Sequence, residues 1–258
     1  MKLYLKYLGM LLKSQLQYRA SFIMMTLGHF LIAFTAFLGV QFLLDRFSSV
    51  GGFSLAEILL CFSVVLMAFS LSECFARGFD VFPRLIRSGQ LDRVLVRPRS
   101  VIFQVLTSNA DFSRLGRVLQ AVLMLAYGIG AGAVEWTGLK ILCLVLMLLG
   151  GVAVFTALFV LYAGISFFTL EGLEFMNIFT DGSREFGKYP LSIYGEGVLK
   201  FCTYVIPIAL FQYWPLLYLV GRSERVALIF LPLLGFLFLL PCYGFFRFGL
   251  RKYQSSGS

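Results

Sequence analysis

The sequence predicts an all-α integral membrane protein with six transmembrane helices, and three observations support this fold class. Of its 258 residues, 59% are hydrophobic and 14% are charged, whereas soluble proteins carry about 25% charged residues. Six apolar stretches approach the roughly 20 residues that a helix needs to cross a bilayer. The alternation of polar and apolar residues that is typical of a transmembrane β-barrel does not occur.

The six predicted spans are separated by short connections. They cover residues 21–44, 55–76, 115–134, 139–168, 199–220 and 226–246. The longest connection, 77–114, is shorter than the roughly 50 residues that an independent domain usually needs. We therefore expect residues 1–258 to form a single transmembrane domain without a nucleotide-binding domain.

The residues before the first span predict an amphipathic helix that lies in the membrane interface. Polar residues recur at Lys2, Lys6, Gly9, Lys13 and Gln17, close to the period of an α-helix, and leucines occupy the other face. Such a helix directs its lysines toward lipid phosphates. A signal peptide is not expected, because Lys6 and Lys13 interrupt the apolar run and no small-residue cleavage site follows. A merely extended first span is the alternative.

The distribution of positive charge predicts the orientation of the protein. With six spans, 18 of the 22 Lys and Arg residues fall on the side that holds both termini. Eight of them are arginines in or beside the connection between the second and third spans, and three are Arg184, Lys188 and Lys200. The positive-inside rule assigns this side to the cytoplasm. The charge thus orients a membrane protein, and we expect no nucleic acid as a partner.

No residue pattern indicates an enzyme. The five cysteines lie in apolar segments without C-x-x-C spacing, so neither disulfides nor a metal site is expected. The single histidine, His29, lies in the first span, where a hydrogen bond within the bundle is a more common role than an ion pathway. Residues 182–188 match part of a P-loop, but Tyr189 replaces the Ser or Thr that binds Mg²⁺ and no strand precedes it. We therefore expect no cofactor in this chain.

Charges near the ends of the spans predict contacts between helices. Glu73 lies four residues before Arg77, a spacing that allows an ion pair on one helix face. We interpret this pair as a pin at the cytoplasmic side of the second span. Asp111, Glu171 and Glu174 also lie near span ends, but the continuous row of carboxylates that a proton relay would need is missing.

Small and aromatic residues indicate how two of the spans pack. The fourth span has small residues on one face at Gly150, Ala153, Ala157 and Gly164. Such faces allow close helix contact in lipid, and we favour packing within one chain over a dimer interface. The fifth span has Pro207 and Pro215 among aromatic residues, which predicts a kinked helix that lines a substrate path or belongs to an interfacial aromatic belt.

The connection between the second and third spans predicts a short amphipathic helix. Pro83 can begin a helix, Gly89 can break it, and Pro98 ends the following turn. That turn has one apolar face, formed by Leu91, Val94 and Leu95. Arginines border this face, so either anionic lipid holds the helix at the membrane or the helix docks onto a cytoplasmic partner.

This connection also resembles a known family. Its segment Ile86-Arg-Ser-Gly-Gln-Leu-Asp-Arg-Val-Leu-Val-Arg-Pro98 is similar to the hallmark of ABC-2-type permeases, in particular the six-span permeases of uncharacterised ABC transport systems. Further similarity lies in Tyr18-Arg19, in Phe186-Gly-Lys-Tyr-Pro190 and in the C-terminal residues 253–258. The resemblance covers nearly the whole chain.

The resemblance implies the permease subunit of an ABC exporter in the bacterial inner membrane. Two such permeases, alike or paralogous, would assemble with two separately encoded ATPases, which bind ATP and Mg²⁺, and with membrane lipids. The connection would contain a coupling helix seated in a cleft of the ATPase. That role falls on Arg87, Gly89, Leu91, Asp92, Arg97 and Pro98. Residues 171–190 would provide a further contact or a hinge.

The resemblance also implies a path between the two permeases, lined by their second and fifth spans. The candidate lining residues are Phe62, Phe69, Tyr204, Phe211 and Trp214. An ATP-independent secondary transporter or channel is the alternative, which inverted repeats or half-helices at the midplane would favour. Neither feature is clear in the sequence.

Overall fold

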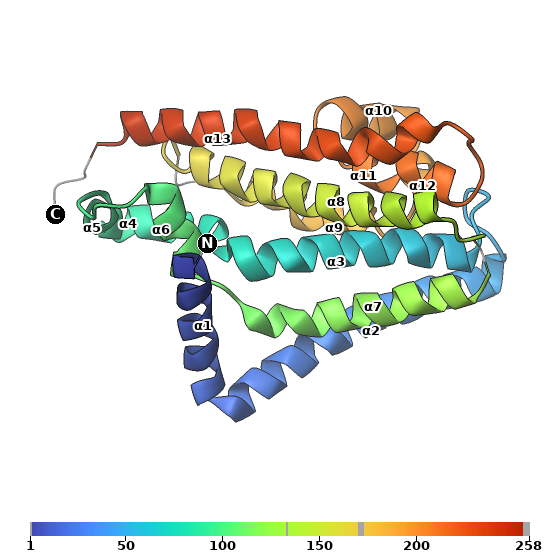
Figure 1. Cartoon of the computed structure of the whole chain (residues 1–258), viewed down its shortest axis with the longest axis horizontal. Coiled ribbons are helices and arrows are strands. Elements are labelled where there is room, and N and C mark those ends of the chain that lie inside the picture. The colour runs from blue at the N-terminus through green and yellow to red at the C-terminus, as the bar shows by residue number, and fades with distance from the viewer. Residues whose placement is uncertain (1, 133, 170–172, 255–258) are drawn as a thin grey trace.

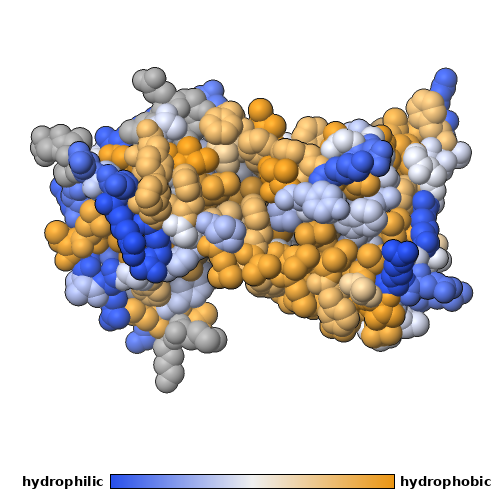
Figure 2. Space-filling model, turned by 90° about the horizontal axis from the view of Figure 1, so that it is seen from above, coloured by the Kyte–Doolittle hydropathy of each residue, from blue (hydrophilic) through white to orange (hydrophobic). Residues whose placement is uncertain are grey.

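A computed structural model describes residues 2–132, 134–169 and 173–254, and within these ranges the chain forms helices and turns but no strand (Figure 1). The prediction of an all-helical protein is confirmed. Glu171 and the C-terminal residues 255–258 lie outside the described residues. On the face that carries α13, an apolar surface lies between polar side chains gathered at two ends (Figure 2).

Four continuous helical stretches within the described ranges are long and apolar enough to cross a membrane. The first and second predicted spans lie within α2 (Arg19–Phe47) and α3 (Leu55–Asp80), and α8 (Gly138–Ile165) contains the fourth except for its last three residues, 166–168. The fourth stretch joins η4 (Val226–Leu233) to α13 (Leu234–Lys252) and contains the sixth predicted span. The long helices run along the bundle in Figure 1.

α3 forms the core of the bundle. In its most apolar stretch 78% of the residues are buried, against 11% in α2, and it packs on both α7 (Leu115–Gly130) and α8. A capping box begins α3, because the Glu57 carboxylate accepts from the Ser54 amide at 2.7 Å while the Ser54 hydroxyl accepts from the Glu57 amide. A helix that is apolar all round belongs in the interior.

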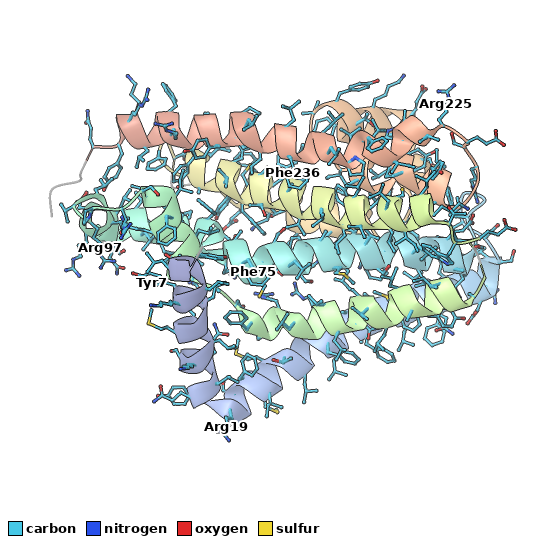
Figure 3. The ribbon with its side chains drawn as sticks, viewed as in Figure 1. Tyr7, Arg19, Phe75, Arg97, Arg225 and Phe236 are labelled. Carbon is cyan, nitrogen blue, oxygen red and sulfur yellow. The ribbon has the colours of Figure 1, made fainter. Side chains whose placement is uncertain are left out.

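The two ends of the bundle are formed by different elements. One end, called the basic end below, holds α4 (Phe82–Arg87), α5 (Gln90–Leu95), α6 (Val101–Ser108) and the end of α13. The opposite end holds the turn residues 48–54, 131–132, 134–137 and 220–225. Figure 3 shows Arg97 at the basic end and Arg225 at the opposite end.

The predicted helix before the first span is present as α1 (Lys2–Gln17), which crosses the bundle at a steep angle (Figure 1). Tyr7 packs edge-on against Phe103 of α6 at 6.2 Å between ring centroids. The Gln15 amide donates to the Ala110 carbonyl and accepts from the Phe112 amide at 3.1 Å. These contacts fix α1 to the basic end.

The predicted third span, 115–134, is only partly helical. α7 ends at Gly130 and has 16 residues, fewer than the roughly 20 that a span needs, although η1 (Phe112–Arg114) precedes it directly. Gly132 adopts a left-handed conformation with φ of 71°. A glycine adopts this conformation at little cost, and it turns the chain out of the helix.

The predicted fifth span, 199–220, is not a continuous helix. α10 (Glu196–Tyr204), α11 (Ala209–Gln212) and α12 (Trp214–Leu219) replace it, and the chain bends by 96° between α10 and the α11–α12 pair. Pro207 lies in the break and Pro215 near the start of α12. Because proline lacks the amide hydrogen of a continuous helix, the expected kink is present, but as a sharp break.

The segment before α10 runs from the basic end to the opposite end. It contains η2 (Leu173–Ile178), α9 (Asp181–Phe186) and η3 (Leu191–Tyr194). Further along, the Cys61 thiol near the start of α3 donates to the Gly187 carbonyl at 3.7 Å. Ile193 then contacts Gly51 in the turn between α2 and α3. Residues 173–194, called the crossing segment below, therefore follow α3 toward its N-terminus.

This course bears on the charge assignment. Arg184 and Lys188 lie in or just after α9, and Lys200 lies in α10 beyond the crossing segment. That these three residues lie on the same side of the membrane as both termini stays a prediction. The crossing segment has short helices and several charges, so hydropathy alone does not indicate its course along α3.

Packing of the small residues stays within the chain. Gly150 of α8 contacts Pro232 of η4, and Gly164 contacts Phe245 of α13. A side chain at either position would overlap these neighbours. The preference for packing within one chain over a dimer interface is confirmed for these two positions.

Candidate functional site

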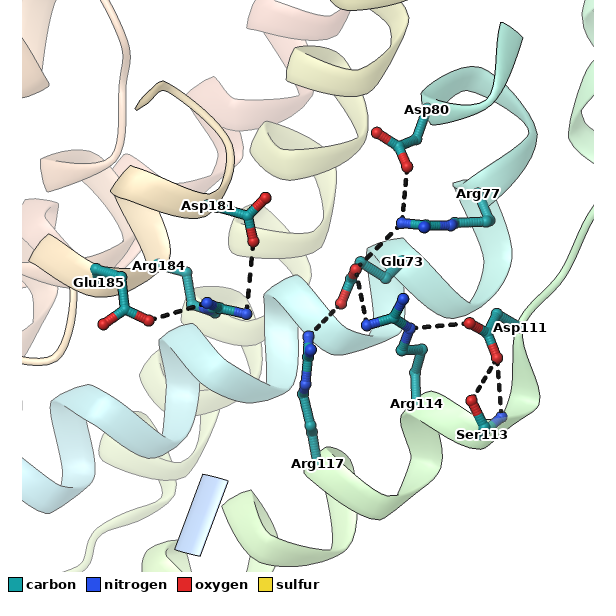
Figure 4. Close-up of polar contacts among 10 residues, drawn as sticks. All are labelled: Glu73, Arg77, Asp80, Asp111, Ser113, Arg114, Arg117, Asp181, Arg184 and Glu185. Carbon is teal, nitrogen blue, oxygen red and sulfur yellow. Dashed lines mark hydrogen bonds and ion pairs between the residues drawn. The ribbon is translucent and has the colours of Figure 1, made fainter. Parts of the chain in front are cut away.

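A buried carboxylate joins α3 to α7 near the basic end (Figure 4). Glu73 is 4% exposed, and its oxygens lie 3.3 Å from Arg77, 3.2 Å from Arg114 and 2.5 Å from Arg117. The predicted Glu73–Arg77 ion pair is confirmed. Arg114 and Arg117 were predicted only to orient the protein in the membrane, although their spacing of three residues already indicated one helix face.

The cluster extends to both ends of its own helices. Arg77 also pairs with Asp80 at 2.7 Å, and Arg114 pairs with Asp111 at 2.9 Å (Figure 4). The Ser113 hydroxyl donates to Asp111 at 2.6 Å. Burial alone would raise the pKa of the Asp111 carboxyl, but the Ser113 hydrogen bonds and the Arg114 guanidinium outweigh it and hold this pKa below its usual range.

The crossing segment approaches the same region with its own charges. Arg184 lies over the Phe69 ring of α3 at 5.1 Å from the ring centroid. Its guanidinium pairs with Asp181 at 3.5 Å and with Glu185 at 2.9 Å (Figure 4). α9 is thus held to α3 by a cation–π contact.

A polar cavity of about 590 Å³ lies between α3, α4, α8 and the crossing segment. Phe69 and Phe159 contribute its apolar surface, and Tyr162 and Asn177 contribute uncharged polar groups. Its charged lining residues are Glu73, Arg77, Asp80, Arg84, Arg87, Glu174 and Asp181. Among the described residues no group of His, Cys, Asp and Glu has the geometry to hold a metal ion.

The connection between α3 and α7 forms three short α-helices, α4, α5 and α6, where one was predicted. Gly89 separates α4 from α5 with φ of 64°, so the predicted break is confirmed. Leu91 is fully buried and anchors α5 to the bundle. The Gln104 amide donates at 2.9 Å to the carbonyls of both Val94 and Arg99, which closes the loop before α6.

The tip of this connection projects from the protein. Val96 is 83% exposed, and Arg97 and Pro98 beside it are also exposed. Of the six coupling residues predicted from the resemblance, Leu91 alone is buried, while Asp92 is partly buried and accepts a hydrogen bond from Tyr253. The accessible apolar surface comes from Leu95 and Val96 instead of Leu91.

Aromatic side chains connect this tip to the bundle. The Phe82 ring at the start of α4 packs on Phe167 at 5.2 Å and on Phe246 of α13 at 5.3 Å. Phe79 and Tyr253 extend the cluster, at 5.8 Å from Phe246 and 6.1 Å from Phe167. A displacement of α4 would therefore press directly on α13 and on the turn that follows α8.

The five candidate path residues lie in three different environments. Phe62 and Phe211 are buried inside the bundle. Phe69 is also buried but borders the polar cavity. Tyr204 and Trp214 border an apolar groove of about 700 Å³ between α10–α12 and η4–α13. The structure does not bring the five together on one surface.

These features define a multi-pass helical membrane protein with a rigidly anchored, exposed connection at its basic end. A family model described as an ABC-2 family transporter protein matches residues 30–257. The chain therefore belongs to the ABC-2 transporter family, as the resemblance implied, and is a membrane permease component of an ABC transporter. No curated protein and no solved structure gives a significant match.

Proposed function

We propose that this chain is the non-catalytic permease subunit of an ABC exporter that couples to separately encoded ATPases through the tip Leu95–Arg99. Two ATPases and a second permease would complete the transporter. Family membership implies an ATPase partner, and the exposed Val96 beside a buried Leu91 is the observation that supports this docking surface. ATP and Mg²⁺ would be bound by the ATPases.

The anchoring of the tip supports its role in transmission. A docking element must be rigid enough to pass on the motion of its partner, and interfaces of packed helices respond by rigid-body movement. The Phe82 cluster joins α4 to the turn that follows α8 and to α13 through ring contacts of 5.2 and 5.3 Å. Closure of the ATPases would therefore move several helices of the permease together.

Mutation of the tip tests this proposal. Val96→Asp combined with Arg97→Glu replaces two exposed side chains and should abolish co-purification with an ATPase co-expressed from a neighbouring reading frame. Arg251→Glu, which also reverses an exposed charge at the basic end, is the matched control. Undiminished co-purification and ATP-dependent transport by the tip variant would contradict the proposal.

We further propose a topology of six crossings that differs from the predicted one. α2, α3, α7, α8, the crossing segment and η4–α13 would each cross once, and α10–α12 would enter and leave from the opposite end. Both termini would then be cytoplasmic, in the bacterial inner membrane. The contact of Ile193 with Gly51 and the place of Glu174 in the cavity beside α4 support the fifth crossing, because Glu174 and Ile193 lie near opposite ends of the crossing segment.

Thiol labelling tests this topology. A Ser223→Cys variant should react with an impermeant reagent from outside the inner membrane, whereas a Ser88→Cys variant should react only from the cytoplasm. Ser223 lies in the turn 220–225 and Ser88 between α4 and α5. Labelling of both from the same side would overturn the orientation.

The break between α10 and α11–α12 also suits the alternative, an ATP-independent transporter or channel. Broken helices are typical of secondary transporters, whose half-helices surround the substrate. Here the break borders an apolar groove, and no acidic or basic side chain lies among its described lining residues. Transport by the permease without any ATPase in sealed vesicles would favour this alternative.

A further inference from the structure

The polar cavity between α3, α4, α8 and the crossing segment is lined by charges of both signs from different elements. Arg84 and Arg87 come from α4, whereas Glu174 comes from η2 and Asp181 from α9. Tyr162 of α8 lies within electrostatic range of Arg84, Arg87 and Glu174. Basic side chains from α4 and acidic side chains from the crossing segment therefore line the same cavity.

Some of these charges are already neutralised within the protein. Glu73 and Asp80 both pair with Arg77, at 3.3 and 2.7 Å. Glu73 also pairs with Arg114 and Arg117, and Arg114 pairs with Asp111. The three carboxylates and three guanidinium groups of this cluster have no net charge, so this side of the cavity is neutral.

Arg84, Glu174 and Asp181 retain charge that a ligand could pair with. Arg84 and Glu174 have no salt bridge with any residue that the structure describes. The Asp181 side chain is 55% exposed, and its ion pair with Arg184 is long, at 3.5 Å. The cavity thus offers one unpaired guanidinium and two carboxylates with spare capacity, beside the hydroxyl of Tyr162 and the amide of Asn177.

The charge pattern selects among ligand classes. A purely anionic ligand would meet Glu174 and Asp181, and a purely cationic one would meet Arg84 and Arg87. A ligand that carries both charges satisfies both sets, because complementary charge arrangement gives specificity. Arginine favours phosphate through paired hydrogen bonds, while carboxylates accept hydrogen bonds from an ammonium group.

We propose that this cavity binds a zwitterionic group in which a phosphate and an ammonium are joined by a short carbon chain. The phosphate would lie against Arg84 and Arg87 and the ammonium against Asp181 and Glu174, with the carbon chain over Phe69 and Phe159. The volume of about 590 Å³ lies within the range of roughly 300–1,000 Å³ of small-molecule sites. The site involves neither the tip nor an ATPase, so it stands independently of the proposed coupling.

Two sources could supply this chemistry: the headgroup of an ethanolamine phospholipid and a soluble phosphoethanolamine. The cavity lies beside α4 at the basic end, where lipid headgroups would also lie if this end faces the cytoplasm. The test therefore needs one experiment on the soluble group and one on the lipid.

The first experiment titrates the full-length protein, in nanodiscs of phosphatidylglycerol, with O-phosphoethanolamine by isothermal calorimetry. O-phosphoethanolamine should bind at least about tenfold more tightly than inorganic phosphate or ethanolamine alone, because each half makes only part of the contacts. Arg84→Gln and Asp181→Asn should each weaken this binding about tenfold, the effect of losing one charged contact.

Arg251→Gln and Glu224→Gln are the matched controls, since they remove exposed charges of the same sign elsewhere. Arg84 and Asp181 are exposed as well, so their variants should fold, and an unchanged melting temperature confirms it. The proposal is overturned if O-phosphoethanolamine binds no better than its two halves, or if the cavity variants match the controls.

The second experiment uses nanodiscs with equal amounts of phosphatidylethanolamine and phosphatidylglycerol, followed by native mass spectrometry. Retention of phosphatidylethanolamine by the unmodified protein, lost in the Arg84→Gln/Asp181→Asn double variant, supports the lipid as the source. Binding of O-phosphoethanolamine without such retention supports a soluble zwitterion. Equal retention of both lipids by the protein and the double variant, together with no calorimetric preference, refutes both.

Discussion

The two ends of the bundle hold their helices together by different interactions. At the basic end, Glu73 joins α3 to α7 through Arg114 and Arg117, at 3.2 and 2.5 Å. At the opposite end, the buried amide of Gln212 donates to the Tyr189 carbonyl at 2.7 Å. Loss of one partner from a buried ionic cluster leaves an uncompensated buried charge, which strongly destabilises the fold. Loss of one partner of a neutral hydrogen bond leaves an unsatisfied polar group, which costs less stability. We therefore expect stability to depend more strongly on charged side chains at the basic end, where we propose that an ATPase binds.

The largest effect is expected from Glu73→Gln. The substitution leaves Arg114 and Arg117 buried without their carboxylate, and loss of one partner of a buried ion pair typically costs about 3–5 kcal/mol. Thermal unfolding of the protein in detergent, followed by circular dichroism, measures the loss. Glu57→Gln is the matched control, because its partner Arg222 at the opposite end is more exposed. Equal melting temperatures for the two variants would show that the two ends do not differ as argued.

A smaller loss is expected from Gln212→Leu. Leucine fills a similar volume but cannot donate to the carbonyls of Tyr189 and Gly187, which lie 2.7 and 3.4 Å from the Gln212 amide. A buried acceptor left without a donor costs about 1–3 kcal/mol. The same unfolding experiment measures it, with Gln17→Leu on the exposed side of α1 as control. A loss as large as that of Glu73→Gln would contradict the comparison.

Acidification should destabilise the basic end, because the Asp111 carboxylate becomes protonated. The pKa of this carboxyl is held below its ordinary value of 3.8, so its contribution to stability is complete above that value and is lost as the pH falls through the lower folded pKa. The melting temperature should therefore fall less steeply in Asp111→Asn than in the unmodified protein between about pH 5 and about pH 3. Asp45→Asn, exposed at the opposite end, should retain the steep fall.

The smallest effect is expected from Arg222→Gln. Arg222 pairs with Glu57 at 3.0 Å and lies over the Phe53 ring at 3.8 Å, but its side chain is partly exposed. Exposed ion pairs contribute about 1 kcal/mol or less. Comparison with Arg225→Gln in the same turn measures the difference. A loss equal to that of Gln212→Leu would show that this end also depends on an ion pair.

Part of the site could be predicted from local sequence. The Glu73–Arg77 pair followed from a spacing of four residues, and the break at Gly89 followed from the conformational freedom of glycine. Arg114 and Arg117 were missed as partners of Glu73 because a separation of 44 residues between Glu73 and Arg117 has no local signal. The cavity was missed for the same reason, since its walls come from three separate stretches of the chain.

The topology shows the same limit. Hydropathy correctly identified the stretches within α2, α3, α8 and η4–α13, because a long apolar helix carries its own signal. It assigned the fifth span to 199–220, where the structure has a 96° break. The crossing segment was overlooked because its charges and short helices resemble a loop until α3 is packed beside it.

The sequence by itself determined that this is a helical membrane protein, where its longest helices lie, and which family it belongs to. Composition, the length of apolar stretches and short motifs do not depend on which distant residues come into contact. The tertiary structure decided which arginines meet Glu73, that Leu91 points inward while Val96 points outward, and that a charged segment runs along α3. Those outcomes depend on distances between residues far apart in the chain, which only packing of the helices can set.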